Sequence, residues 1–296
     1  MKKWIAMLLA ALMVFSMAAC AAKNEPAADQ TNDQTAADTQ TSEPAEDTAS
    51  GEDAAPAADQ TAADSDMAYV QSKGTLVVGI TDFAPMDYQN ESGEWIGFDA
   101  DMAKAFAESL GVSVEFVEID WDNKILELGS KSIDCVWNGM TLTDEVLNAM
   151  ECTAPYLVNA QVVVMKSDKV ADYADVDAMK DLAVAVESGS AGDETATNNG
   201  FTNVTKVTAQ ADALMEVASG TADACIIDLT MAKAMTGDGT SYADLSVAAE
   251  MDREEYGIGF RKGSDMAQKV NDIIASLKDD GTLQALADKY GLSLID

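Results

Sequence analysis

Short apolar runs alternate with helix-like segments along this chain, and the alternation occurs twice. In the first unit we predict strands and helices, in chain order, at 76–80, 99–110, 112–117, 122–128 and 133–137. In the second unit we predict them at 182–186, 204–207, 210–218 and 224–227. Strands that alternate with helices usually form a mainly parallel sheet covered on both faces. The pattern therefore predicts an α/β protein with two lobes.

Two further apolar runs are predicted to connect the lobes. Residues 161–165 lie between the two units and are expected to cross from the first lobe to the second. Residues 255–260 are the candidate return strand, because helical segments follow them to the end of the chain. The first lobe would then comprise residues 67–160 and 252–296, and the second lobe residues 161–251.

The first twenty residues have the layout of an export signal. Two lysines precede an apolar stretch from Trp4 to Ala19, which is short for a membrane span and ends in small residues before Cys20. This ending resembles the lipobox of bacterial lipoproteins, although Met17 stands where that pattern usually has Leu. We therefore predict a signal peptide, lipidation of Cys20 and anchoring to the extracytoplasmic face of the cell membrane. Ordinary cleavage nearby is the alternative.

Residues 21–66 are predicted to form a disordered acidic tether. The segment is rich in Ala, Thr, Asp, Glu, Gln and Pro, has no aromatic residue, and contains Lys23 as its only basic residue. Such a composition cannot bury enough apolar surface to offset the entropy lost on ordering.

Charge and composition exclude several functions. The chain has 52 Asp and Glu against 18 Lys and Arg, a net charge of −34, so we do not expect nucleic-acid binding, which needs basic patches. It has no His, which removes the commonest general base, the usual hydrolase triads and His-containing zinc sites. Cys135, Cys152 and Cys225 are an odd number that fits no complete disulfide framework, and one bridge between two of them is the alternative. No metal or cofactor is expected.

Small polar residues follow the predicted strand at 133–137. They are Asn138, Gly139 and Thr141. Thr143, with two acidic residues behind it, is a candidate N-cap for a helix. The polar residues would thus lie between the carboxyl end of a strand and a helix start, where open α/β sheets hold small ligands. An ordinary strand-to-helix connection is the alternative.

Several short motifs together resemble the solute-binding proteins that serve polar amino acid ABC transporters. They are Gly97-Phe98-Asp99-Ala100-Asp101, Asp134 with Asn138-Gly139-Met140-Thr141, Ala154-Pro155-Tyr156, Gly189-Ser190, Asp223 to Asp228, Tyr256-Gly257-Ile258 and Asp280-Gly281-Thr282-Leu283. The resemblance implies a periplasmic-binding-protein-like type II fold, in which two hinge strands join two lobes. It also implies a monomeric binding protein, not an enzyme, that closes on a polar amino acid or related amine and delivers it to a permease and its ATPase.

The resemblance further implies the residues that bind the ligand. They are Phe83 and Trp121, whose rings would enclose it; Asn138, Gly139 and Thr141, which would hold its carboxylate; Ser190 and Ala191, at a helix N-terminus that favours an anion; and Asp228, which would receive its amino group. One position departs from the family pattern. Val146 stands where the family usually has an Arg that pairs with the α-carboxylate. A charge-assisted bond of this kind contributes ~1.5 to 3 kcal/mol.

The chain has only two arginines, Arg253 and Arg261, and neither is near position 146 in the sequence. Arg261 is predicted to lie in an exposed turn. The standard α-amino acid is therefore in doubt, and a ligand with a cationic amine, with or without a carboxylate, becomes the hypothesis.

Acidic and aromatic residues support a cationic ligand. Glu187 precedes Ser188-Gly189-Ser190 at a position that faces the cleft in the family, and Asp82 would add to its charge. Trp137 could supply a further ring face for a cation. Two other functions stay open: a dehydratase on the same fold, acting on cyclic precursors of aromatic amino acids with Glu187 as acid or base, and a ligand-sensing surface lipoprotein.

Overall fold

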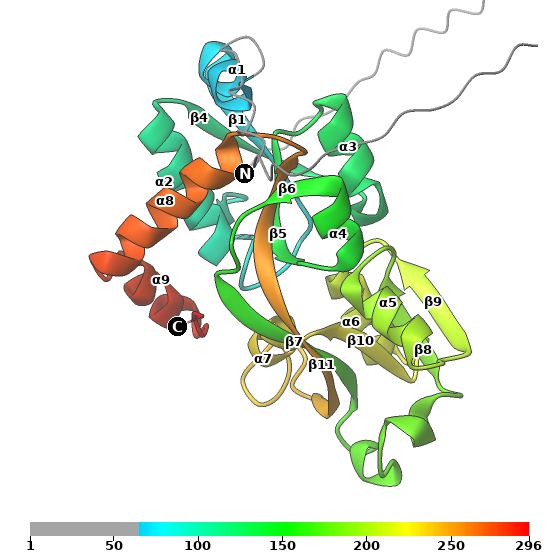
Figure 1. Cartoon of the computed structure of the whole chain (residues 1–296). Coiled ribbons are helices and arrows are strands. Elements are labelled where there is room, and N and C mark those ends of the chain that lie inside the picture. The colour runs from blue at the N-terminus through cyan, green and yellow to red at the C-terminus, as the bar shows by residue number, and fades with distance from the viewer. Residues whose placement is uncertain (1–64, 296) are drawn as a thin grey trace, which may run out of the picture. The chain divides into compact units, whose positions relative to one another are not determined.

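The computed structural model describes residues 65–295 (Figure 1). The predicted signal peptide, Cys20 and the tether up to residue 64 lie outside the described residues. The helices are α1 (Asp66–Lys73), α2 (Phe98–Leu110), α3 (Lys124–Ser130), α4 (Asp144–Ala149), α5 (Ala191–Asn198), α6 (Gln210–Ser219), α7 (Leu229–Met235), α8 (Met266–Asp279) and α9 (Thr282–Tyr290). The 3-10 helices are η1 (Trp121–Asn123), η2 (Val170–Asp172) and η3 (Val176–Met179).

The strands are β1 (Thr75–Ile80), β2 (Tyr88–Gln89), β3 (Trp95–Ile96), β4 (Ser113–Glu118), β5 (Cys135–Thr141), β6 (Met150–Cys152), β7 (Leu157–Lys166), β8 (Ala183–Glu187), β9 (Asn203–Val207), β10 (Ala224–Asp228) and β11 (Leu245–Arg261). All except β2 and β3 form one mixed sheet, in the order β4-β1-β5-β11-β7-β10-β8-β9 with β6 beside β11. In the first lobe β1 is parallel to β4 and β5, and in the second β8 is parallel to β9 and β10. The two predicted α/β units are confirmed.

Strands β7 and β11 connect the lobes and pair with each other. Their antiparallel register runs from Leu157 opposite Tyr256 to Lys166 opposite Leu245, with two irregularities along β11. Both strands are longer than the predicted runs at 161–165 and 255–260. The two lobes therefore share one hydrogen-bonded ribbon.

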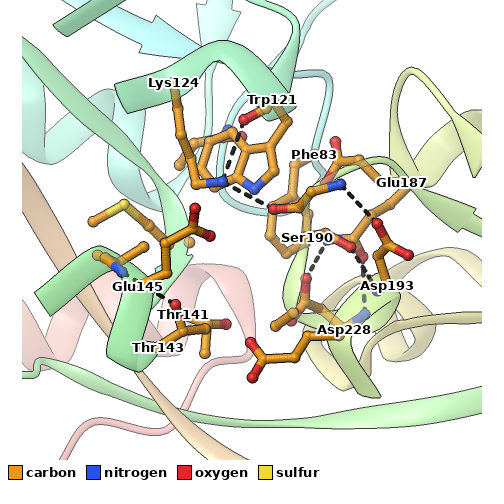
Figure 2. A pocket seen from close by; sticks show the side chains of 18 of the residues that line it. Phe83, Trp121, Lys124, Thr141, Thr143, Glu145, Glu187, Ser190, Asp193 and Asp228 are labelled. Carbon is orange, nitrogen blue, oxygen red and sulfur yellow. Dashed lines mark hydrogen bonds between the residues drawn. The ribbon is translucent and has the colours of Figure 1, made fainter. Parts of the chain in front are cut away.

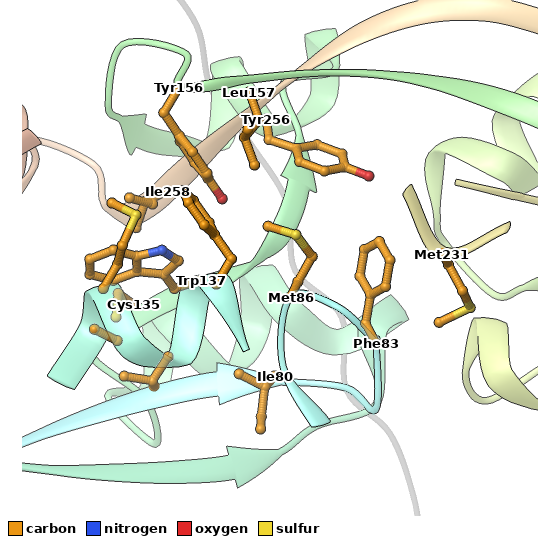
Figure 3. Close-up of a cluster of buried hydrophobic side chains, with 14 of the residues drawn as sticks. Ile80, Phe83, Met86, Cys135, Trp137, Tyr156, Leu157, Met231, Tyr256 and Ile258 are labelled. Carbon is orange, nitrogen blue, oxygen red and sulfur yellow. The ribbon is translucent and has the colours of Figure 1, made fainter. Parts of the chain in front are cut away.

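The helix α2 shows how the sequence sets these elements. Its buried residues recur at helical spacing, among them Phe98, Met102 and Phe106, so one face packs on the sheet. Gly111 ends the helix in a left-handed conformation, with φ 73°, which glycine adopts without steric cost. The same core continues under the connecting strands, where Phe83 lies between Met86 and Met231 (Figure 3).

The end of β5 differs from its prediction. The strand extends through Asn138 and Gly139 to Thr141, because these residues lie in the sheet and Thr141 pairs with Tyr256 of β11. They are part of the strand and do not form a loop after it. Thr143 does cap the next helix: its side chain accepts a hydrogen bond from the Val146 N–H at the start of α4.

The prediction of an exposed turn at Arg261 is wrong. Arg261 is the last residue of β11, and its side chain is only 12% exposed. Its Nε lies 3.0 Å from Asp66, and its Nη2 lies 3.5 Å from an oxygen of Asp134, whose side chain is fully buried. Lys73 also pairs with Asp134, at 2.6 Å. Ser65 and Asp66, which the sequence places in the tether, are the N-cap and the first residue of α1.

The described cysteines, Cys135, Cys152 and Cys225, are all free. No helix within residues 65–295 is long and apolar enough to cross a membrane.

The two arginines offer a matched test of the buried ion-pair cluster. We expect Arg261→Met to lower the free energy of unfolding by about 3 kcal/mol, because it removes one of the two cations that pair with the buried Asp134. Lys73, the other cation, remains. Arg253→Met should change it by no more than about 0.5 kcal/mol, since that side chain is exposed. Urea unfolding of both variants measures the difference, and equal losses would contradict a stabilising role for the cluster.

Candidate ligand-binding site

A pocket of about 350 Å³ is lined by residues of both lobes (Figure 2). The first lobe contributes Phe83, Trp121, Lys124, Asn138, Gly139, Met140, Thr141, Thr143, Glu145 and Val146. The second lobe contributes Glu187, Gly189, Ser190, Ala191, Asp193, Glu194, Thr197, Asn198, Lys206, Gln210 and Asp228. The pocket brings together the predicted ligand-binding residues except Asp82 and Trp137.

The two predicted aromatic residues lie at the pocket and are well fixed. Phe83 is 2% exposed and meets the Tyr256 ring edge-on, with centroids 6.4 Å apart. Trp121 is 6% exposed and forms the first residue of η1, which is capped by the Asp120 side chain. Both rings are therefore held in place by the protein before any ligand contact.

The polar groups of β5 are engaged by the protein. The Asn138 amide bonds to Thr81 and donates to Asp87, and the Gly139 N–H donates to Asp99 at 2.6 Å. The Thr141 hydroxyl donates to Glu254 at 2.8 Å. All three residues line the pocket, and their predicted contact with a ligand carboxylate stays a prediction. Their hydrogen bonds fix β5.

Buried carboxylates lie beneath this part of β5. Asp99 accepts hydrogen bonds from the Tyr156 hydroxyl, and burial raises its pKa to about 7, although the bonds from Gly139 and Tyr156 oppose the rise. Burial also raises the pKa of Asp87, and the neighbouring Asp99 adds to that shift. Asp87 and Asp99 thus form a buried acid cluster that bonds to Asn138 and Gly139 of β5.

The start of α5 forms one side of the pocket. Ser190 caps the helix by accepting a hydrogen bond from the Asp193 N–H, and Ala191 is the first helical residue. The first N–H groups of a helix have no partner within it and carry partial positive charge. Gly189 precedes the cap, and a Cβ at this position would lie 2.5 Å from an Asp122 oxygen of the other lobe.

Asp228 ends β10 and is 3% exposed. It accepts hydrogen bonds from Asn159, Gln161 and Gln210. The first two of these amides also donate to Glu254 of β11, at 2.6 and 2.8 Å. Burial raises the pKa of Asp228 well above its ordinary value, and the charge of Glu254 adds to the shift.

Glu187 ends β8 and is 2% exposed. Burial raises its pKa to about 8, while Lys124, Thr81 and Gln210 act in the opposite direction. Its Oε1 has no hydrogen-bond partner among residues 65–295. A buried oxygen of this kind can accept a donor from a ligand.

Sequence reasoning missed Lys124, which is 4% exposed at the pocket. Its Nζ donates to Gly189 O at 2.9 Å and to Trp121 O at 3.3 Å, and lies 5.2 Å from the Trp121 ring centroid. Burial lowers its pKa, and Glu145 and Glu187 oppose this. A signal was present: Lys124 follows Trp121 by three residues, a spacing that places two side chains on one face of a helix.

Two predicted residues lie elsewhere. Asp82 is exposed at a second cavity, which Tyr88, Trp95 and Glu118 also line, because it points away from Phe83 in the same turn. Trp137 is 1% exposed and packs against Phe106 in the core, so it offers no ring face to a ligand. Within residues 65–295, no group of three Cys, Asp or Glu side chains is arranged to hold a metal ion.

The pattern of the bacterial extracellular solute-binding proteins, family 3, matches residues 76–293. The chain belongs to this family. This solute-binding protein is 30% identical over 225 residues to the L-cystine-binding protein TcyJ of Escherichia coli, covering 75% of this chain and 84% of that one. It is 28% identical over 302 residues to the arginine-binding extracellular protein ArtP of Bacillus subtilis, covering 98% of each.

Its structure resembles that of a mutant of ArgBP from T. maritima, with a TM-score of 0.71 and 31% identity over 76% of this chain and 98% of the other. These likenesses confirm the predicted family, the type II fold and the substrate-binding role of this extracytoplasmic protein.

Glu187 should make the stability of this solute-binding protein depend on pH. Its pKa of about 8 in the folded protein exceeds the ordinary 4.5, so the protonated acid stabilises the fold. That contribution is fully present below about pH 4.5 and is lost as the pH rises through about 8. We expect the unfolding free energy of Glu187→Gln, relative to wild type, to rise over this window by up to about 1.4 kcal/mol per pH unit.

Urea unfolding at pH 5, 6, 7 and 8 measures this change. Glu194→Gln, at an exposed position on the same pocket, is the matched control and should keep the wild-type profile. A pH-independent difference between Glu187→Gln and wild type would contradict the burial effect.

Proposed function

We propose that this chain captures a polar amino acid or related amine outside the cell and delivers it to an ABC permease by cleft closure. The observation that carries the proposal is the pocket itself, which takes its lining from both lobes. A ligand that contacts both lobes stabilises only the closed form, so binding shifts the population toward closure. The paired strands β7 and β11 supply the connection about which the lobes would move.

The distribution of charge supports a ligand with an amino group. Glu187 and Asp228 present buried carboxyl groups whose pKa values are raised. The positive charge of a bound ammonium would favour their ionised forms. The start of α5 offers N–H groups to an anion on another side of the same pocket. Phe83 and Trp121 would enclose the apolar part of the ligand. The relatives named for cystine and arginine bind ligands of this kind, with amino and carboxylate groups together.

We further propose that Cys20 carries the lipid and that residues 21–64 tether the folded part to the membrane. The support is the sequence alone, with small residues before Cys20 and an acidic, non-aromatic segment after it. We propose that the protein works as a monomer beside its permease. A dehydratase on this fold would need an acid in the cleft, and Glu187, with its pKa of about 8, is the residue that could act as one.

A ligand screen tests the binding role. We expect L-arginine, L-histidine or L-cystine, or a related amine, to stabilise the purified chain by about 2.7 kcal/mol at a hundred times its dissociation constant. Asp228→Asn should weaken the same ligand by about tenfold or more, because it removes a charge that receives the amino group. Thermal-shift measurements followed by calorimetry give both values. Tight binding of L-glutamate or L-aspartate, without any response to cationic amino acids or amines, would refute the proposed specificity.

A fractionation experiment tests the anchor. Cys20→Ser should move the protein from the membrane fraction to the medium or periplasm, since the lipid attaches through the thiol. Cys152→Ser, at a free cysteine in the folded part, should leave it on the membrane. Retention of the Cys20→Ser protein on membranes would rule out a lipid anchor at this residue.

A further inference from the structure

Lys124 is a buried cation at the pocket without a carboxylate partner among residues 65–295. Its two hydrogen bonds go to the backbone oxygens of Trp121 and Gly189. A Lys ammonium has three donors, so one is left for another acceptor. Lys is almost never fully buried unless it is paired with an opposite charge. The position of this ammonium therefore needs an explanation beyond packing.

The surroundings of Lys124 match an anion. Its Nζ lies 2.9 Å from Gly189 O, and the next residue, Ser190, is the N-cap of α5. The ammonium and the helix N-terminus, which carries partial positive charge, therefore lie side by side at the pocket (Figure 2). An anion held by the first N–H groups of α5 would be within reach of Lys124. The buried carboxyl groups of Glu187 and Asp228 remain for a cationic group of the same ligand.

The apolar residue at position 146 makes the charge of Lys124 important for an anionic group of the ligand. The resemblance implies an Arg at this position, whereas Val146 is 2% exposed and packs in an apolar cluster with Trp121 and Met140. The two arginines of the chain do not supply a cation to the pocket. Arg261, at the end of β11, is bound to Asp66 and Asp134. Arg253 pairs with Glu250 at the surface. Within the described pocket lining, the cations are Lys124 and Lys206, and Lys206 is paired with Asp193 at 2.7 Å.

We propose that Lys124 binds the α-carboxylate of the ligand and replaces the Arg that this chain lacks at position 146. This inference rests on the proposed binding function and narrows its ligand to α-amino acids, excluding carboxylate-free amines. A Lys offers a point charge and not the planar fork of an Arg, so it bonds a carboxylate without fixing its plane. The N–H groups at the start of α5 would supply the orientation.

A different role for Lys124 gives different results. Because its Nζ bonds Gly189 of the other lobe, Lys124 could act only as a clasp that favours closure. A clasp would strengthen the binding of every ligand equally. A carboxylate partner strengthens the binding of amino acids but not of their decarboxylated analogues.

The test uses pairs of ligands that differ only in the carboxylate, L-arginine with agmatine and L-histidine with histamine. Calorimetry on the full chain gives each dissociation constant for wild type, Lys124→Gln and Lys124→Met. We expect both variants to weaken the amino acid by about 10- to 150-fold and its amine by less than about threefold. Lys169→Gln, which removes an exposed lysine outside the pocket lining, is the matched control and should change neither ligand by more than about threefold.

Each alternative result overturns the inference. Equal weakening of amino acid and amine would make Lys124 a clasp, and no weakening would remove it from binding altogether. If wild type binds agmatine or histamine but neither amino acid, the binding function stands and the carboxylate role falls. If wild type binds none of these probes nor any other amino acid or amine of the screen, the proposed function itself fails.

Discussion

The pairing of β7 with β11 is the constraint on which the rest of the structure depends. It joins the sheets of the two lobes into one, and it carries Asn159, Gln161 and Glu254 beneath the pocket. The amides of the first two bond both Glu254 and Asp228, so the carboxylate of the second lobe is tied to the connecting strands themselves. Any change in the geometry of this ribbon therefore reaches the site directly.

In this very acidic protein, burial sets the protonation of the carboxyl groups at and near the pocket. Most carboxylates of residues 65–295 are on the surface, but Asp99, Glu187 and Asp228 are buried at or near the pocket with raised pKa values. Protonated acids can donate as well as accept, so the pocket can exchange protons with a ligand as it binds. Lys124 is the counterpart, since burial lowers its pKa and nearby carboxylates oppose that effect. The raised pKa values of Glu187 and Asp228 thus reduce the negative charge that the pocket carries.

Periodicity and motif order predicted the two lobes, the connecting strands and several residues of the pocket, but they missed Lys124. They could not predict the roles of Asn138 and Gly139, because the partners Asp87 and Asp99 come from distant parts of the chain. The direction of Asp82 depends on a turn whose next residue, Phe83, points the other way. Arg261 was misplaced for the same reason, since its partner Asp66 lies 195 residues away. Local patterns specify elements, whereas long-range polar contacts specify what each side chain does.

The close approach of Gly189 to Asp122 of the other lobe has a consequence for ligand loading. This contact joins the lobes through the protein's own atoms, so it would favour a closed form whether or not a ligand is bound. Such stabilisation raises apparent affinity for every ligand, because less of the binding free energy is used for closure. It would also reduce the difference in conformation between the ligand-bound and the ligand-free protein, by which a permease would tell them apart. The contact at residue 189 would therefore increase ligand affinity while making the bound and free conformations more alike.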